Sequence, residues 1–187
     1  MRRFNSDKLP LAGLKAITRK RIGDTRGFIS RIFCAEELSD IGWDKPIAQI
    51  NHTYTAKRAT VRGMHFQYPP HAETKLVSCI RGAIWDVAVD VRAGSPTCLR
   101  SHAECLSADN GKMLLIPEGF AHGFQTLTND VELIYVHSAV YAPDVEAGLN
   151  PMDPRLAIEW PLNIVEMSSR DESHPLIDSG SFEGVVL

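Results

Sequence analysis

The sequence lacks the features that are typical of nucleic-acid-binding, membrane-spanning and secreted proteins. Its 20 basic and 23 acidic side chains leave a formal net charge of −3, which is not the basic excess expected of a general nucleic-acid binder. No uninterrupted apolar stretch approaches the roughly 20 residues that a membrane-spanning helix needs. Residues 1–20 carry charges but no sustained apolar run, so they make a poor secretory signal peptide. We therefore expect a cytoplasmic protein.

Cysteine is scarce and widely spaced. The four cysteines are Cys34, Cys79, Cys98 and Cys105. No two of them have the C-x-x-C spacing that is typical of a zinc knuckle or a redox dithiol. We expect free thiols that are buried or partly buried.

Helical patterns are few, and short strand-like runs dominate. Residues 83–92 (AIWDVAVDVR) alternate apolar and polar side chains with the two-residue period of a strand. Similar runs occupy residues 27–33, 48–54, 74–80, 112–116, 121–127 and 131–139. Turn signals such as Asn110-Gly111 separate them. Many short strands with regular turns predict an all-β sandwich or barrel.

The chain length and the extent of the strand-like runs indicate how this barrel is organised. At 187 residues the chain is long enough for one domain with a substantial core. We expect the core at about residues 25–142, with a few short helices, one of them at residues 35–40. Residues 143–187 contain several prolines and no regular pattern, so we expect them to wrap the barrel rather than to form a second domain.

Two histidines lie in strand-like segments that end in turn glycines. The first segment, RGMHFQ, contains His65, and the second, PEGFAHGF, contains His122. A histidine with an unperturbed pKa near 6.5 is the natural general base at neutral pH. In an extended segment Phe120, His122 and Phe124 point the same way, so they are expected to line one pocket. Each histidine could instead be a buried, hydrogen-bonded structural residue.

A metal site is the alternative use of these histidines. His65, Glu73 and His122 have side chains that can bind a metal, but the first segment lacks an H-x-H pair. Lys75 follows closely, and a cation near the site would repel a divalent ion. We therefore expect no metal. Lys75 and Arg62 could also be solvated surface charges, and Tyr135 could be a core aromatic residue.

Several boxes carry a resemblance to known proteins. Gly111 to His122 reads G-x5-P-x-G-x2-H, which resembles the second conserved box of the cupin jelly rolls. The ordered set of boxes over about residues 20–178 resembles the dTDP-4-keto-6-deoxyglucose 3,5-epimerase (dTDP-4-dehydrorhamnose 3,5-epimerase) family. In this sequence the boxes include DTRGF at 24–28, QIN at 49–51, RGMHFQ at 62–67, IPEGFAHGF at 116–124 and SSRD at 168–171. The implied fold is a cupin-type double-stranded jelly-roll β-barrel.

The resemblance also implies a role for individual residues. The catalytic base falls on His65, its paired carboxylate on Asp171, the general acid on Tyr135, and the lysine beside the substrate ketone on Lys75. The positions that match contacts to the nucleotide sugar are Arg26, Gln49, Asn51, Arg62, His122, Tyr141, Glu146 and Arg170. The family is metal-free and needs no cofactor. It is dimeric, with N-terminal strands exchanged between the subunits.

The reaction implied is epimerisation of a nucleotide-linked 4-keto-6-deoxyhexose in deoxysugar biosynthesis, such as the supply of O-antigen or other polysaccharide precursors. Inversion is expected at C3, with inversion at C5 left open. The alternatives are a 3,4-ketoisomerase on the same substrate class, a non-catalytic sugar-binding cupin and a metal-dependent cupin oxygenase.

Four positions depart from the usual pattern of the family. Arg31 stands in place of a glutamate, Ile50 in place of an aspartate, Val140 in place of an aromatic residue and Arg170 in place of a lysine. Most of them fall among the nucleotide or sugar contacts and not among the proton-transfer residues. They leave open whether the nucleotide is dTDP or CDP, and which sugar is bound, more than the class of reaction.

Overall fold

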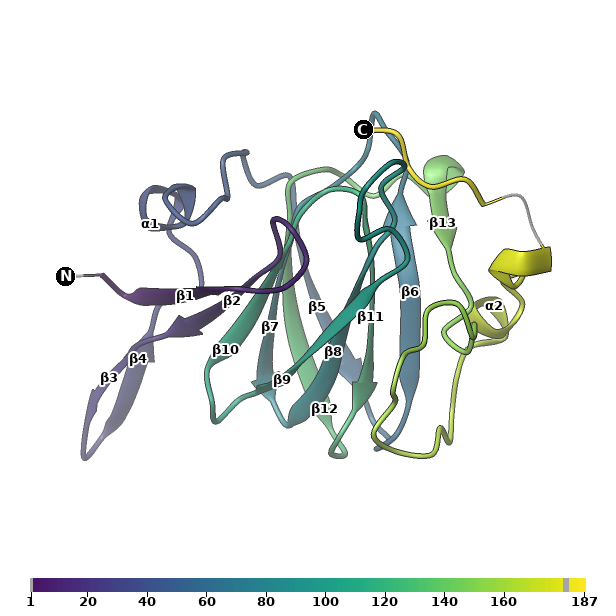
Figure 1. The fold of residues 1–187 in the computed structure, drawn as a ribbon. Helices are drawn as coiled ribbons and strands as arrows, with labels where there is room; N and C mark the ends of the chain where they lie inside the picture. Colours follow the sequence, from purple (N-terminus) through teal and green to yellow (C-terminus); the bar gives the residue numbers. More distant parts are fainter. Residues whose placement is uncertain (1, 180–181) are drawn as a thin grey trace.

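Two antiparallel β-sheets face each other and form the body of the molecule (Figure 1). The structure is a computed structural model, and it describes residues 2–179 and 182–187. The six-stranded sheet has the order β1-β2-β10-β7-β12-β5, and the five-stranded sheet has the order β13-β6-β11-β8-β9. A separate hairpin, β3-β4, extends away from both sheets on the side opposite to α2 (Figure 1).

The strands and helices have the following bounds. The strands are β1 (Phe4–Lys8), β2 (Lys15–Arg19), β3 (Arg21–Asp24), β4 (Gly27–Ser30), β5 (Gln49–Thr55), β6 (Val61–Gln67), β7 (Lys75–Arg81), β8 (Ala83–Asp90), β9 (Ser101–Ser107), β10 (Lys112–Ile116), β11 (Phe120–Thr126), β12 (Val131–His137) and β13 (Glu146–Gly148). The helices are α1 (Ala35–Ser39) and α2 (Ser169–Glu172), with 3-10 turns at Pro143–Val145 and Ile177–Ser179. None of the helices in the described residues is long and apolar enough to cross a membrane.

The all-β prediction is confirmed, and each predicted strand run overlaps an observed strand. Six elements were not predicted: β1, β2, β3, β9, β13 and α2. β1 has the sequence FNSDK and buries only Phe4, because it is the edge strand of its sheet and pairs with β2 alone. Its polar composition therefore hides the strand from a pattern search. The large sheet consequently begins well before residue 25.

Strand β8 shows the predicted alternation, but both of its faces are buried. Val87, Val89 and Val91 face outward and pack beneath the C-terminal segment, against Leu149 and Leu156 among others. The opposite face carries Ile84 and Ala88 into the core between the sheets, and Asp86 lies on that inner face with no exposed surface. A carboxylate is thus held inside the sandwich.

Candidate active site

A cavity of about 210 Å3 lies between the two sheets, and two of the four candidate catalytic side chains, His65 and Tyr135, line it. One wall comes from the five-stranded sheet, where His65 on β6 and His122 on β11 are directly paired in the strand register. The other wall comes from β12 of the six-stranded sheet, which contributes Tyr135 and His137. The structure therefore places the predicted base and the predicted acid on opposite walls of one cavity.

His65 is held by the carboxylate of Asp171, at 2.7 Å between Nε2 and Oδ1. The second oxygen of Asp171 accepts a hydrogen bond from the backbone amide of Gly63 at 3.2 Å. Burial raises the pKa of Asp171, but the hydrogen bond and charge of His65, together with the Gly63 amide, outweigh it, so the pKa lies below its ordinary value. An ionised carboxylate only accepts hydrogen bonds. The Nε2 atom of His65 therefore carries the proton, and Nδ1 is the free ring nitrogen.

A helix start positions Asp171. The hydroxyl of Ser168 accepts a hydrogen bond from the Asp171 amide at 3.1 Å, which caps the N-terminus of α2. This short helix brings the carboxylate to a histidine that lies 106 positions earlier in the chain.

Two glycines allow β6 and β11 to approach closely beside the histidines. A Cβ atom at Gly63 would lie 2.4 Å from the Cα of Gly123, and Gly63 has a φ of +125°. Both the space and the backbone conformation therefore exclude a larger residue at position 63. The register between the two strands shifts between His122 and Phe124, which is typical of a bulge next to a functional site.

His122 forms a second histidine–aspartate pair, with Asp86 on β8. The Nε2 and Oδ1 atoms are 2.7 Å apart, and neither side chain is more than 5% exposed. Burial raises the pKa of Asp86, and this outweighs the opposing effects of His122 and Lys75. Tyr135 packs edge-on against His122, with ring centroids 5.7 Å apart. Burial and the nearby Asp86 raise the pKa of Tyr135 well above 10, so the phenol keeps its proton at neutral pH.

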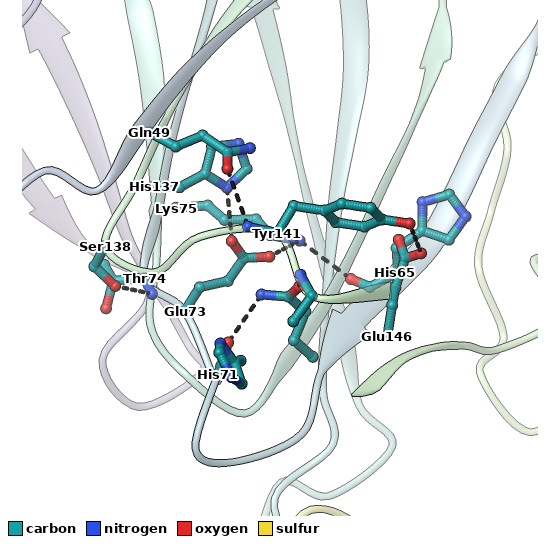
Figure 2. Close-up of polar contacts among 12 residues, drawn as sticks. Gln49, His65, His71, Glu73, Thr74, Lys75, His137, Ser138, Tyr141 and Glu146 are labelled. Atoms are coloured by element: carbon teal, nitrogen blue, oxygen red, sulfur yellow. Dashed lines mark hydrogen bonds and ion pairs between the residues drawn. The ribbon is translucent and has the colours of Figure 1, made fainter. Parts of the chain in front are cut away.

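Lys75 belongs to a third charged group, shown in Figure 2. Glu73 lies between Lys75, at 3.1 Å from Nζ, and His137, at 2.7 Å from Nδ1. The Lys75 amine also donates to the carbonyl oxygen of His65 at 3.4 Å. Burial raises the pKa of Glu73, but the hydrogen bond from His137 and the charge of Lys75 bring it below its ordinary value. Lys75 is thus a buried, paired cation behind the cavity rather than a solvated surface charge.

Four of the predicted nucleotide-sugar residues gather near Gln67, at the end of β6. The Tyr141 hydroxyl donates to Glu146 Oε2 at 2.9 Å (Figure 2), and Arg170 donates to the same oxygen at 2.5 Å. The Tyr141 amide donates to Gln49 Oε1 at 3.0 Å. The aromatic ring of Tyr141 is exposed, so it is free to stack on a ligand.

A second, larger pocket of about 570 Å3 shares Arg62 and His65 with the first cavity. Arg170 and Asp171 also line it. Two guanidinium groups therefore stand beside the smaller cavity. Asn51 and Arg62 line the smaller cavity itself, as does Phe124. Phe120, which was expected beside them, instead lies in the hydrophobic core.

Arg26 is not brought to this region within one chain. It lies at the tip of the β3-β4 hairpin, where it pairs with Asp24 at 2.6 Å, and both side chains are exposed. The four departures from the family pattern are also at the surface. Arg31 forms an ion pair with Glu37, and Ile50 is 58% exposed on β5.

The residues weighed as metal ligands are distributed over three separate groups. His65 contacts Asp171, His122 contacts Asp86, and Glu73 contacts His137 and Lys75. Within residues 2–179 and 182–187, one group of three has potential ligand atoms within 4.8 Å of one another, and it consists of His65, Asp171 and His174. That group differs from the set weighed from the sequence.

One side chain of the cavity and two carboxylates bonded to cavity side chains were missed or misjudged from the sequence. Asp86 was seen only as the polar face of a strand, and Glu73 was considered only as a metal ligand. His137 was not considered at all. The two-residue period of a strand places His137 on the same face as Tyr135, so this signal was available.

Comparison with known proteins agrees with this geometry. A sequence profile described as dTDP-4-dehydrorhamnose 3,5-epimerase matches residues 8–179. A dTDP-4-dehydrorhamnose 3,5-epimerase of Sinorhizobium fredii is 41% identical over 172 residues, which are 89% of this chain and 86% of that protein. A dTDP-4-dehydrorhamnose 3-epimerase of Streptomyces niveus is 34% identical over 179 residues, which are 95% of this chain and 86% of that protein.

Among solved structures, a dTDP-6-deoxy-D-glucose-3,5-epimerase of Legionella pneumophila in complex with dTDP-4-keto-L-rhamnose superposes with a TM-score of 0.92. It is 34% identical, and the match covers 98% of each chain. Such neighbours are cupin jelly rolls, which confirms the predicted fold class. The profile, the relatives and the shared fold show that the chain belongs to the dTDP-4-dehydrorhamnose 3,5-epimerase family.

Proposed function

We propose that the protein epimerises a nucleotide-linked 4-keto-6-deoxyhexose at C3, with slower or no inversion at C5, in deoxysugar biosynthesis. The single observation that carries this proposal is the placement of the His65–Asp171 pair and Tyr135 on opposite walls of one cavity. Inversion of a carbon centre requires a base on one face of the ring and an acid on the other. Membership of the epimerase family supports the same reaction class.

The proposed chemistry begins with the ketone at C4, which acidifies the proton on C3. His65 removes that proton, and the electron pair moves to the C4 oxygen as an enolate. Asp171 stabilises the imidazolium that forms. Lys75 stabilises the enolate oxygen, and one such preorganised donor is typically worth about 3 kcal/mol. Tyr135 then returns a proton to C3 from the opposite face, and the ketone re-forms.

The position of Tyr135 across the cavity from His65 also helps to decide between the alternative functions. A 3,4-ketoisomerase must move a proton between neighbouring carbons and needs no donor on the far face of the ring. Tyr135, protonated and opposite His65, therefore favours epimerisation. A non-catalytic sugar-binding protein would have no use for a base, an orienting carboxylate and an acid together.

The larger pocket is the proposed place of the diphosphate. Arg62 and Arg170 both line it, and guanidinium groups recognise phosphate through paired hydrogen bonds. The exposed ring of Tyr141 is proposed to stack on the nucleobase. We expect a pyrimidine nucleotide, with dTDP favoured over CDP. A cytoplasmic location remains a prediction.

A homodimer with exchanged N-terminal strands is also proposed, and the β3-β4 hairpin supports it. The hairpin projects from the sheets (Figure 1). Its Phe28 and Ile29 are 60% and 74% exposed. Such apolar side chains on an extended hairpin suit burial against a second copy. In that arrangement Arg26 would reach the nucleotide sugar of the partner. Phe28→Asp should then shift the sedimentation coefficient of the protein from dimer to monomer.

Two experiments test the proposed function in sequence. A thermal-shift comparison of dTDP, CDP, UDP and GDP should show a selective rise with a pyrimidine nucleotide, because a ligand that binds only the folded state raises its stability. The 4-keto sugar nucleotide is then incubated with enzyme in D2O, and exchange at C3 and C5 is followed by NMR. C3 should exchange first. A thermal shift with GDP alone, or exchange at C5 without C3, would contradict the proposal.

A further inference from the structure

His137 stands out in the catalytic cavity because one of its ring nitrogens is unused. The residue is 8% exposed, it lines the cavity, and its Nδ1 atom is bonded to Glu73 at 2.7 Å. Its Nε2 atom is buried and has no hydrogen-bond partner among the described residues. Buried polar atoms are nearly always paired, so an unpaired one on a side chain that lines a cavity calls for an explanation.

The neighbours of His137 fix its position and, in the neutral ring, its tautomer. Its ring lies almost parallel to that of Tyr135, at 18° with centroids 5.9 Å apart, so it is packed rather than free to rotate. Glu73 is also bonded to Lys75, and its lowered pKa keeps it ionised. An ionised carboxylate accepts, so Nδ1 of His137 donates. In the neutral imidazole, Nε2 is then a hydrogen-bond acceptor.

An acceptor in this position requires a donor on the ligand. A sugar offers hydroxyl groups for this, whereas its ketone and ring oxygens only accept. Lys75, expected at the C4 oxygen, shares Glu73 with His137 (Figure 2). In the strand register His137 and Lys75 are direct partners on β12 and β7. Two groups that are joined through one carboxylate are suited to contact oxygens on adjacent carbons.

We propose that His137 is a substrate-recognition residue whose Nε2 atom accepts a hydrogen bond from the C3 hydroxyl of the hexose. This inference rests on the proposed function, since it takes the ligand to be a 4-keto sugar nucleotide. Glu73 acts through His137 as a positioning residue, because it fixes the tautomer. A site built to bond a hydroxyl discriminates against the analogue that lacks it, because the buried acceptor is then left unpaired.

The test uses sugar nucleotides that lack the ketone and therefore cannot react. The dissociation constants of dTDP-6-deoxyglucose and of its 3-deoxy and 2-deoxy analogues are measured by titration calorimetry. Wild-type protein should bind the 3-deoxy analogue about 10- to 100-fold more weakly than the parent. His137→Phe keeps an aromatic ring beside Tyr135 but has no acceptor, so its ratio for the same two ligands should fall to within about twofold of unity.

A matched control comes from His102, which is bonded to Glu104 at 3.1 Å and lines neither cavity. His102→Phe should keep the wild-type ratio. Comparing ligands within one variant separates recognition from a general loss of folded protein. An equal 3-deoxy ratio in wild type and His137→Phe, or an effect confined to the 2-deoxy analogue, would overturn the inference. Failure of all three ligands to bind wild-type protein would instead contradict the proposed function.

Discussion

Asp171→Asn is the change that examines the proposed mechanism most directly. In the structure Asp171 accepts one hydrogen bond from His65 Nε2 and one from the Gly63 amide. Asparagine can keep the bond from Gly63 with its carbonyl oxygen, and its amide group then faces Nε2 as a donor. Nε2 must consequently become the acceptor, and the ring proton moves to Nδ1. The nitrogen that should take up the substrate proton is then already occupied.

The expected magnitude follows from this change of tautomer. The same replacement at a comparable histidine–aspartate pair lowers turnover by roughly 10⁴-fold, which corresponds to about 5 kcal/mol on the activation barrier. The fold should tolerate the change, because two hydrogen bonds are still made. A net change of about 1 kcal/mol would shift the melting temperature of a protein of this size by about 2–4 °C.

The assay is exchange of the C3 proton in D2O under single-turnover conditions, followed by NMR. Asp90→Asn is the control, because Asp90 is also a buried carboxylate but lines neither pocket. It should lose stability and keep its exchange rate. If Asp171→Asn is folded and exchanges the proton within about tenfold of the wild-type rate, the reasoning on the tautomer is refuted.

Three further predictions follow from the same structure. His65→Asn should remain folded and lose roughly 10²–10⁴-fold in turnover, as is typical when a general base is removed; near-normal turnover would exclude His65 from the mechanism. Activity should survive exhaustive chelation, because Lys75 lies behind the cavity and repels a divalent ion; a loss that one specific divalent ion restores would contradict this. Burial raises the pKa of Asp90, but hydrogen bonds from Arg92, Ser95 and Thr97 outweigh this effect and lower the pKa to about 2. The lowered pKa stabilises the fold by about 2.5 kcal/mol at neutral pH. Because the folded pKa is depressed, this contribution should be complete above about pH 5 and be lost as the pH falls toward 2; a urea-unfolding series should show Asp90→Asn with a weaker acid dependence than wild type.

Much of the fold could be predicted because most strands have one apolar face and clear turns. The limits appear where that rule fails. In β8 both faces are buried, so alternation alone could not tell that Asp86 points inward and Val87 outward. In β1 almost nothing is buried, so there was no alternation to detect. Alternation therefore does not tell which face of a strand buried on both sides points inward, and it does not reveal an exposed edge strand such as β1.

The candidate site shows a similar division. His65 and His122 could be found from their local boxes, and the strand register then pairs them. Asp171 could not be joined to His65 by any spacing rule, because the contact spans 106 positions and depends on a four-residue helix. The Glu73–His137 pair has a sequence separation of 64 and likewise depends on the packing of β12 against β7. Residue types can thus be proposed from sequence patterns, whereas their partners come from tertiary structure or, for Asp171, from the resemblance to a known family.

The electrostatics of the cavity favour His65 over His122 as the base, although both rings are bonded to an aspartate at 2.7 Å. A base must become an imidazolium, so its partner has to remain ionised. Asp171 receives a second hydrogen bond from Gly63, and its pKa is lowered. Asp86 is fully buried with one oxygen unpaired among the described residues, and its pKa is raised.

The exposure of the two histidines also favours His65 as the base. The His65 side chain is 30% exposed and borders both pockets, whereas that of His122 is 5% exposed. A positive charge on His65 is therefore stabilised by an ionised partner and by contact with solvent. On His122 it would depend on a carboxylate that burial drives toward its neutral form. The histidine with the ionised partner thus also has the more open path to the substrate, and the role we propose for His122 is to orient the sugar.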